Sequence, residues 1–155
     1  MSHHPIIEIL LIEDSPTDAE LTLRALRKHH LANHVLHLAD GQAALDWLYG
    51  TGTQAGPAAN QLPQVVLLDL KMPKVGGLEV LRAIRADART RCLPVVVMTS
   101  SQEPQDLIES YHLGANSYVV KPVDSEAFAA AIAELGHYWL LVNKTPGGIT
   151  RKGIL

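Results

Sequence analysis

Acidic, hydroxyl and basic side chains stand directly after short apolar segments of this sequence. Glu13 and Asp14 follow one such segment, Asp69 follows another, and Thr99 and Lys121 follow two more. Three carboxylates brought together would repel one another and raise the pKa of at least one of them, unless a cation neutralised them. Carboxylate oxygens suit Mg²⁺, which takes one or two protein carboxylates together with waters and phosphate oxygens. The residue types therefore predict a Mg²⁺ site that handles phosphate.

The same residues can divide the work of phosphoryl transfer. The carboxylate of Asp69 could attack a phosphoryl donor, while the metal offsets the charge on the transferring oxygens. Lys121 would add a positive charge, and the hydroxyl of Thr99 would donate a hydrogen bond. Any one of these residues, taken alone, is more often a helix cap or an ordinary strand end. Their placement after successive strands gives the prediction its weight.

Strand-like and helical patterns alternate along the chain. The strand-like segments are Ile6 to Ile12, Val35 to Leu38, Val65 to Leu68, Val95 to Met98 and Ser117 to Val120. Helical patterns follow them; Ser15 and Asp40 are expected to cap the first two, and the last runs from about Asp124 past Trp139. Five strands alternating with five helices predict an α/β fold, with a parallel sheet covered on both faces. Ligands of such sheets bind beyond the carboxyl ends of the strands, where the candidate residues stand.

The composition is that of one ordinary globular domain. The chain has 155 residues, of which 47% are hydrophobic and 19% charged, and a second domain would need about 100 more residues. Its net charge of −3, with scattered Lys and Arg, argues against direct binding of nucleic acid. No apolar segment approaches the roughly 18 residues of a membrane span, and the N-terminus lacks the features of a signal peptide. We therefore expect a cytoplasmic protein that does not enter the membrane.

Cys92 is the single cysteine of the chain, so an intrachain disulfide is impossible. It stands beside the apolar segment that begins near Pro94. This position predicts that the thiol is buried like an ordinary small apolar side chain.

Four segments resemble the motifs of the receiver domain of two-component response regulators, in the family's order and approximate spacing. They are Glu13-Asp14, Leu67-Leu68-Asp69-Leu70-Lys71-Met72-Pro73, Val95-Val96-Val97-Met98-Thr99-Ser100 and Val119-Val120-Lys121-Pro122. The resemblance extends over nearly the whole chain, from about Ile7 to Leu141. It implies a flavodoxin-like, doubly wound sheet of five parallel strands in the order 2-1-3-4-5, with five helices.

The resemblance also implies a phosphorylation switch rather than an enzyme that acts on a separate substrate. A partner histidine kinase would supply the phosphoryl group, which Asp69 would hold while Mg²⁺ is present. The chain would catalyse only its own phosphorylation and dephosphorylation. Glu13, Asp14, Asp69 and the backbone carbonyl of Lys71 would form the metal site.

In receivers, the residue that matches Thr99 moves toward the phosphoryl group, and the aromatic residue that matches Tyr118 rotates inward. Together they would change the surface around the fourth helix, the fifth strand and the fifth helix, as a population shift between two states. Two positions depart from the commonest pattern. Lys71 stands two residues after the acceptor, where many receivers carry Asn, and Ser101 stands two residues after Thr99. Both flank the path of an attacking water and are expected to tune the lifetime of the phosphate, in a direction the sequence does not indicate.

The receiver is expected to span residues 1–142, followed by a short tail, 143–155, with no output domain. Its output would then be a contact with another protein. The long segment from Gly50 to Leu62 and the ending from Leu135 to Leu141 resemble the small regulators that are paired with phytochrome-type sensor kinases.

The end of the last helix is apolar on every side, whereas a terminal surface helix normally keeps a polar face. Exposed apolar patches usually mark an interface. We therefore expect a symmetric homodimer through the last helix; the alternative is that the tail folds back and covers the patch. The residues concerned are Tyr138, Trp139, Leu140, Leu141 and Val142.

Three other functions are compatible with a doubly wound sheet. A phosphatase with an aspartate nucleophile would usually carry a second acid two residues later, where this chain has Lys71. A flavin or dinucleotide binder would need small residues and free backbone amides after the first strand, where this chain has Glu13 and Asp14. The third is a receiver that no longer takes phosphate and only binds protein. Retention of all five site residues argues against it.

Overall fold

The computed structural model describes residues 6–50 and 56–146 of the chain. It contains one sheet of five parallel strands in the order β2-β1-β3-β4-β5. The strands are β1 (Ile9–Ile12), β2 (Val35–Leu38), β3 (Val65–Leu68), β4 (Val95–Thr99) and β5 (Ser117–Val120). The α-helices between and after them are α1 (Pro16–Lys28), α2 (Gly41–Tyr49), α3 (Gly77–Ala86), α4 (Pro104–His112) and α5 (Ser125–His137). The predicted fold class and strand order are confirmed.

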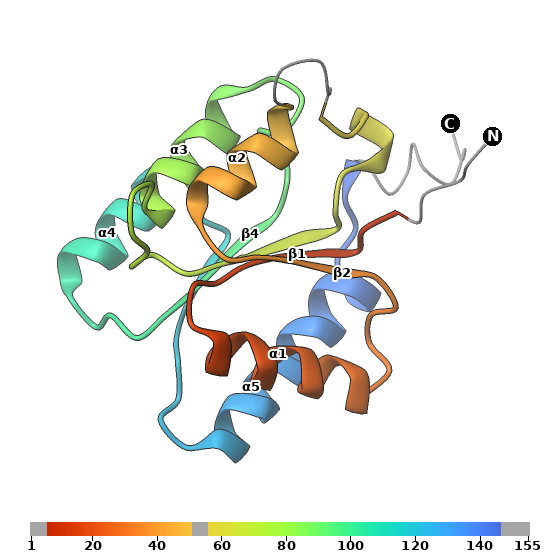
Figure 1. Ribbon diagram of the computed structural model, residues 1–155, viewed down its shortest axis with the longest axis vertical. Helices are drawn as coiled ribbons and strands as arrows, with labels where there is room; N and C mark the ends of the chain where they lie inside the picture. The colour runs from red at the N-terminus through yellow and green to blue at the C-terminus, as the bar shows by residue number, and fades with distance from the viewer. Residues whose placement is uncertain (1–5, 51–55, 147–155) are drawn as a thin grey trace.

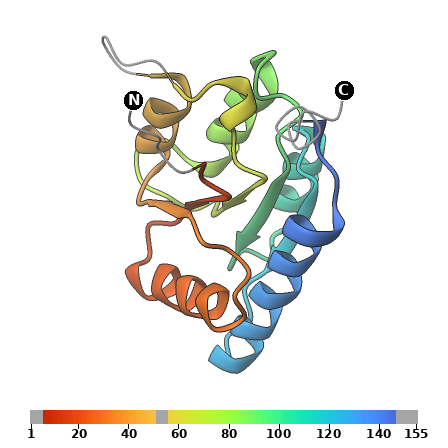
Figure 2. The same cartoon turned by 90° about the vertical axis from the view of Figure 1, so that its right-hand side faces the viewer.

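The helices cover both faces of the sheet. Figure 1 shows α2, α3 and α4 on one side of the strands and α1 and α5 on the other, and α1 and α5 lie side by side in both views (Figures 1 and 2). Successive residues of a strand point to opposite faces. In β1, Leu10 and Ile12 accordingly pack in the core under α2 and α3, while Ile9 and Leu11 pack in the core under α1 and α5. All four side chains are buried, which is why the strand reads as a continuous apolar segment.

Polar side chains fix where three of the helices begin. The hydroxyl of Ser15 accepts the backbone N–H of Asp18 at 3.2 Å, and Pro16 occupies the first position of α1. The carboxylate of Asp40 accepts the N–H of Ala43 at 2.7 Å, at the start of α2. The carboxylate of Asp124 accepts the N–H of Ala127 at 2.8 Å, at the start of α5. These caps satisfy backbone donors that have no partner within their helices.

The ends of the chain differ in detail from the expected elements. Strand β1 begins at Ile9 rather than Ile6, although Glu8 still donates its backbone N–H to the carbonyl of His34 at 2.8 Å. After α5, the residues Tyr138–Val142 form a π-helical turn, closed by a hydrogen bond from the N–H of Asn143 to the carbonyl of Tyr138 at 2.7 Å. Most of the predicted tail, from residue 147 on, lies outside the described part of the chain.

The internal segment from Gly50 to Leu62 contains a short 3₁₀ turn at Ala59–Gln61. Its residues 51–55 also lie outside the described part of the chain.

The predicted burial of Cys92 is wrong, because its thiol is exposed. Cys92 lies in a tight turn in which the N–H of Leu93 donates to the carbonyl of Thr90 at 2.9 Å. The turn directs Leu93 and Thr90 into the protein, with 5% and 0% of their surfaces exposed, and leaves Cys92 outside.

Within the described ranges 6–50 and 56–146, no helix has the length and apolar character required to cross a membrane.

Candidate functional site

The five predicted residues lie at one edge of the sheet, because parallel strands end on the same side. Hydrogen bonds between neighbouring strands continue just past the strand ends. The N–H of Asp69 donates to the carbonyl of Ile12 at 3.0 Å, and the N–H of Lys121 donates to the carbonyl of Thr99 at 2.7 Å. Asp69 is thereby held beside Glu13 and Asp14, and Lys121 beside Thr99.

The three acids form one cluster. Carboxylate oxygens of Glu13, Asp14 and Asp69 all lie within 4.8 Å of one another. Glu13 and Asp69 are buried, with 4% and 7% of their surfaces exposed, whereas Asp14 faces solvent. Three hard oxygen donors around one point, one of them open to water, are the donor set that suits a hydrated divalent cation. The cluster could therefore hold a metal ion.

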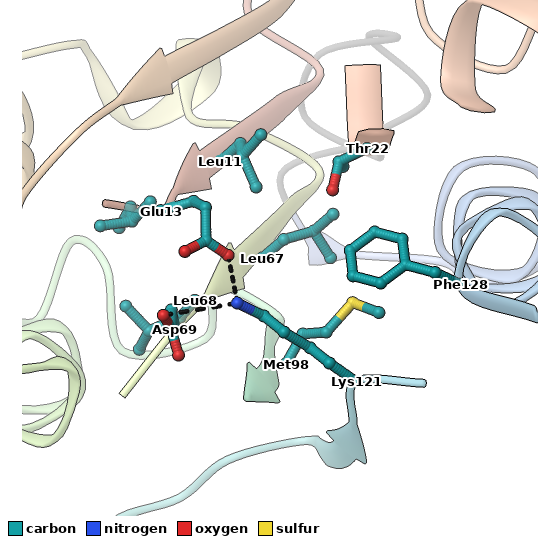
Figure 3. Close-up of a pocket in the computed structure, with 10 residues that line it drawn as sticks. Leu11, Glu13, Thr22, Leu67, Leu68, Asp69, Met98, Lys121 and Phe128 are labelled. Carbon is teal, nitrogen blue, oxygen red and sulfur yellow. Dashed lines mark hydrogen bonds and ion pairs between the residues drawn. The ribbon is translucent and has the colours of Figure 1, made fainter. Parts of the chain in front are cut away.

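Lys121 supplies the positive charge at the cluster. Its ammonium lies 2.6 Å from Oε1 of Glu13, 2.8 Å from Oδ2 of Asp18 and 3.5 Å from Oδ2 of Asp69, and only 7% of the side chain is exposed. Figure 3 shows the lysine reaching across the floor of the site towards Glu13 and Asp69. Asp18 is a site residue that the sequence analysis missed. It stands in the first turn of α1, where an acid is ordinarily explained by the helix dipole alone.

The pKa values of Glu13 and Lys121 are both raised, but for different reasons. Burial raises the pKa of Glu13 to about 7, and the charge of Asp69 adds to this against the opposing effect of Lys121. Burial alone would lower the pKa of Lys121, but hydrogen bonds to Asp18 and Glu13 and the charge of Asp69 outweigh it and raise the pKa to about 12. The pKa of Glu13 shifts in the direction expected for one acid of the cluster, but burial, rather than repulsion from the neighbouring carboxylates, is the largest cause. One ammonium does not fully neutralise the acids around it.

We expect this imbalance to appear as a pH dependence of folding in the presence of EDTA. The folded state holds the proton of Glu13 more tightly than the unfolded chain, so the free energy of unfolding should fall as the pH rises from about 4.5 to about 7. Urea denaturation at a series of pH values measures this. Glu13→Gln should remove that part of the slope, while the control Glu79→Gln, which changes an exposed acid of α3, should keep it. Parallel profiles for wild type and Glu13→Gln would contradict the assignment.

His37 of β2 also contacts the acidic segment. Its Nε2 lies 2.8 Å from the backbone carbonyl of Glu13, and because a carbonyl only accepts, that nitrogen must carry a hydrogen. The bond supports the chain where β1 ends and the acidic pair begins. The sequence analysis did not identify this histidine, since only the pairing of β2 with β1 brings it there.

Little space remains beside the buried part of the site. The hollow lined by Glu13, Asp69 and Lys121 has a volume of about 10 Å³ (Figure 3), which is room for about one water molecule. An isoalloxazine or nicotinamide ring does not fit into it. A reacting group would therefore have to approach from the exposed edge of the site, where Asp14 faces solvent.

Thr99 and Tyr118 both contact the loop that follows β4. The hydroxyl of Thr99, which is fully buried, accepts the N–H of Ser101 at 3.2 Å. The hydroxyl of Tyr118 donates to the carbonyl of Ser101 at 3.0 Å. Both predicted switch residues are thus connected to Ser101.

Lys71 follows the acceptor, in the loop between β3 and α3. Its ammonium lies 3.2 Å from Oδ2 of Asp106 in α4, so the side chain is directed across to the first turn of that helix. The loop is closed at its far end by Gly77, where an added Cβ would lie 2.3 Å from the backbone oxygen of Asp69. Glycine therefore allows α3 to begin directly against the acceptor residue.

Sequence comparisons relate the chain to a known family and to a curated protein. Residues 9–133 match the family described as the response regulator receiver domain. The chain is 41% identical over 142 residues to the probable methanogenesis regulatory protein FilR2 of Methanothrix harundinacea, covering 90% of this chain and 87% of that protein.

Two solved structures are similar over almost their whole length. The Mn²⁺-bound form of response regulator Rcp1 superposes with a TM-score of 0.82 at 33% identity, covering 92% of this chain and 99% of that chain. The curated Rcp1 sequence comes from Synechocystis. The bacteriophytochrome response regulator AtBRR is 50% identical, with a TM-score of 0.66, covering 91% of this chain and 100% of that one.

Proposed function

Because the chain belongs to the response regulator receiver family, we propose that Asp69 accepts a phosphoryl group at a Mg²⁺ site formed with Glu13 and Asp14. A receiver domain implies a partner histidine kinase, so the chain is a signalling protein of a two-component system. The main support for this proposal is the acidic cluster. Carboxylate oxygens of its three members lie within 4.8 Å of one another, and the ammonium of Lys121 lies 3.5 Å from Asp69.

The transfer itself needs few groups. An oxygen of Asp69 forms a bond to phosphorus, the bond from phosphorus to the donor's histidine nitrogen breaks, and the electron pair stays on that nitrogen. Mg²⁺, when bound, would neutralise charge on the transferring oxygens. The ammonium of Lys121 lies 3.5 Å from Oδ2 of Asp69. It can therefore donate a hydrogen bond to an oxygen of the phosphoryl group that Asp69 accepts. Glu13, Asp14 and the backbone carbonyl of Lys71 would complete the metal's protein ligands. That the similar Rcp1 has a Mn²⁺-bound form supports a divalent cation in such a protein.

The same groups would govern the switch. We propose that the hydroxyl of Thr99 leaves the N–H of Ser101 and donates to the phosphoryl group. Because Tyr118 is hydrogen-bonded to the carbonyl of Ser101 at 3.0 Å, a movement of that loop would be transmitted to Tyr118 and so to β5. A shift between two states of this kind requires only that one state contacts the phosphoryl group and the other does not.

The output is proposed to be a contact with another protein. Residues 1–142 would form the receiver and 143–155 a short tail. Apolar side chains are exposed on α4, at the end of β5 and just after it, which fits a protein partner. They are Leu107, Ile108, Tyr111, Val120 and Val123. The likeness to AtBRR, a bacteriophytochrome response regulator, supports a phytochrome-type kinase as the phosphoryl donor. We further propose that the protein acts in the cytoplasm, where ATP-dependent kinase domains work, and without direct contact to nucleic acid.

A homodimer through the last helix is also proposed. In the π-helical turn, Trp139 and Leu140 pack partly against the core, whereas Tyr138, Leu141 and Val142 are 47%, 64% and 51% exposed. The charge-introducing change Leu141→Glu should therefore shift sedimentation from dimer to monomer at micromolar concentrations. The control Gln102→Glu adds the same charge in an exposed loop and should leave the dimer intact. A monomeric wild type would contradict the proposal.

Incubation with acetyl phosphate tests the central proposal. In the presence of Mg²⁺ the intact mass should rise by one phosphoryl group per chain, and in EDTA it should not change. Peptide mapping should locate the group on the segment that contains Asp69. If the mass does not rise with Mg²⁺, the proposal is wrong, and the alternative of a receiver that binds its partner without phosphate is favoured.

A further inference from the structure

Asp106 is a carboxylate that lies outside the acidic cluster, yet it contacts two residues that flank the acceptor. Its Oδ2 accepts the hydroxyl of Ser101 at 2.5 Å and lies 3.2 Å from the ammonium of Lys71. Only 13% of the Asp106 side chain is exposed. Lys71 and Ser101 are the two positions at which this sequence departs from the commonest receiver pattern, and one carboxylate holds both.

The position of Asp106 is fixed by its own backbone. It stands in the first turn of α4, where its N–H donates to the carbonyl of Glu103 at 3.1 Å. Its carbonyl accepts the buried hydroxyl of Ser110 at 2.7 Å. The backbone of Asp106 is therefore anchored in α4 and its side chain is mostly buried, whereas the side chain of Lys71 is 63% exposed.

Ser101 is also held from several directions. Its N–H donates to Thr99 at 3.2 Å, its carbonyl accepts Tyr118 at 3.0 Å, and its hydroxyl donates to Asp106. The hydrogen of that hydroxyl is thus engaged with Asp106. It is not available to orient a water near Asp69.

We propose that Asp106 is a positioning residue that holds Lys71 and Ser101 across the opening between the loops after β3 and β4, and so slows hydrolysis of the phosphoaspartate. This inference rests on the proposed function of Asp69. The strands β3 and β4 are neighbours, so the loops that follow them border the same edge of the sheet. The ion pair joins one loop to the helix that follows the other.

The geometry of hydrolysis gives the direction of the effect. The water oxygen must form its bond to phosphorus on the side opposite the bond that breaks, which is the bond to the oxygen of Asp69. Asp69 leaves as a carboxylate, and inorganic phosphate carries away the oxygen of the water. That approach lies outward from the sheet edge, between the loop after β3 and the start of α4, which the ion pair of Lys71 with Asp106 joins. Under this proposal, the side chain of Lys71 narrows the approach while Asp106 holds it. Releasing Lys71 should therefore shorten the lifetime of the phosphate.

The decay of the phosphorylated protein tests this. Each variant is loaded with acetyl phosphate and Mg²⁺, freed of the donor, and followed by intact mass. Asp106→Asn and Lys71→Asn should each decay several-fold faster than wild type. The double variant should decay no faster than the faster single variant, because both changes release the same contact. Lys71→Arg, which keeps the ion pair, should decay as slowly as wild type.

The control is Glu109→Gln, which removes a charge from the same helix at a side chain paired with Gln105 rather than Lys71. It should decay like wild type. Unchanged decay in Asp106→Asn, or rate increases that multiply in the double variant, would overturn the positioning role while leaving phosphorylation of Asp69 intact. If wild type takes up no phosphoryl group at all, the proposed function fails and this inference fails with it.

Discussion

Asp69→Asn should take up no phosphoryl group from acetyl phosphate and Mg²⁺, under conditions in which wild type gains one. The amide has nearly the shape of the carboxylate but lacks the anionic oxygen that forms the bond to phosphorus. Asp69 is 7% exposed, and its backbone is held by the N–H bond to Ile12 at 3.0 Å, so the site should otherwise keep its geometry. Intact mass spectrometry measures the result as the presence or absence of one added group.

A matched variant separates this loss from a general effect of removing an acid. Asp46→Asn changes an aspartate of α2 that pairs with Gln42 at 2.9 Å, far along the chain from the acceptor, and it should be phosphorylated like wild type. Asp14→Asn keeps the acceptor but removes a proposed metal ligand, so it should need more Mg²⁺ for the same uptake. Equal phosphorylation of Asp69→Asn and wild type would mean that another group is the acceptor.

The elements of this fold could be predicted because their signals are local. Ser15, Asp40 and Asp124 cap the helices that follow them, and each cap is formed within three residues of sequence. The order of the strands followed from the family resemblance, whereas the register comes from the packed structure alone. Cys92 was assigned wrongly because the choice between it and Leu93 depends on how one turn is oriented.

Parts of the site escaped prediction because they depend on contacts between distant segments. Asp18 meets Lys121 across 103 residues of sequence, and this contact requires α1 to lie beside the end of β5. Asp106 meets Lys71 only because α4 begins beside the loop after β3. An acid in the first turn of a helix has an ordinary explanation in the helix dipole, so neither residue stands out in the sequence. Such an acid becomes a candidate site residue when a lysine or serine near the acceptor has no other assigned partner.

Lys121→Met should lower the free energy of unfolding in EDTA at pH 8 by about 3 kcal/mol, because removing one partner leaves buried charges uncompensated. The ammonium contacts Glu13, Asp18 and Asp69 at 2.6, 2.8 and 3.5 Å, and methionine fills similar space without charge. For wild type, the contribution of Lys121 is complete below pH 10.5 and is lost as the pH rises through about 12, because folding raises this pKa. Urea denaturation measures the difference between the two proteins.

The source of this loss can be identified by restoring neutrality in two ways. Lowering the pH to 5 protonates Glu13, whose pKa is raised to about 7 in the wild-type site, and Mg²⁺ supplies positive charge directly; each should recover part of the stability of Lys121→Met. Lys144→Met changes an exposed lysine and should alter stability by no more than about 0.5 kcal/mol under all three conditions. A loss in Lys121→Met that neither acid nor Mg²⁺ reduces would mean that the lysine matters for packing. The acids would then tolerate one another without it, and the electrostatic account of the site would be wrong.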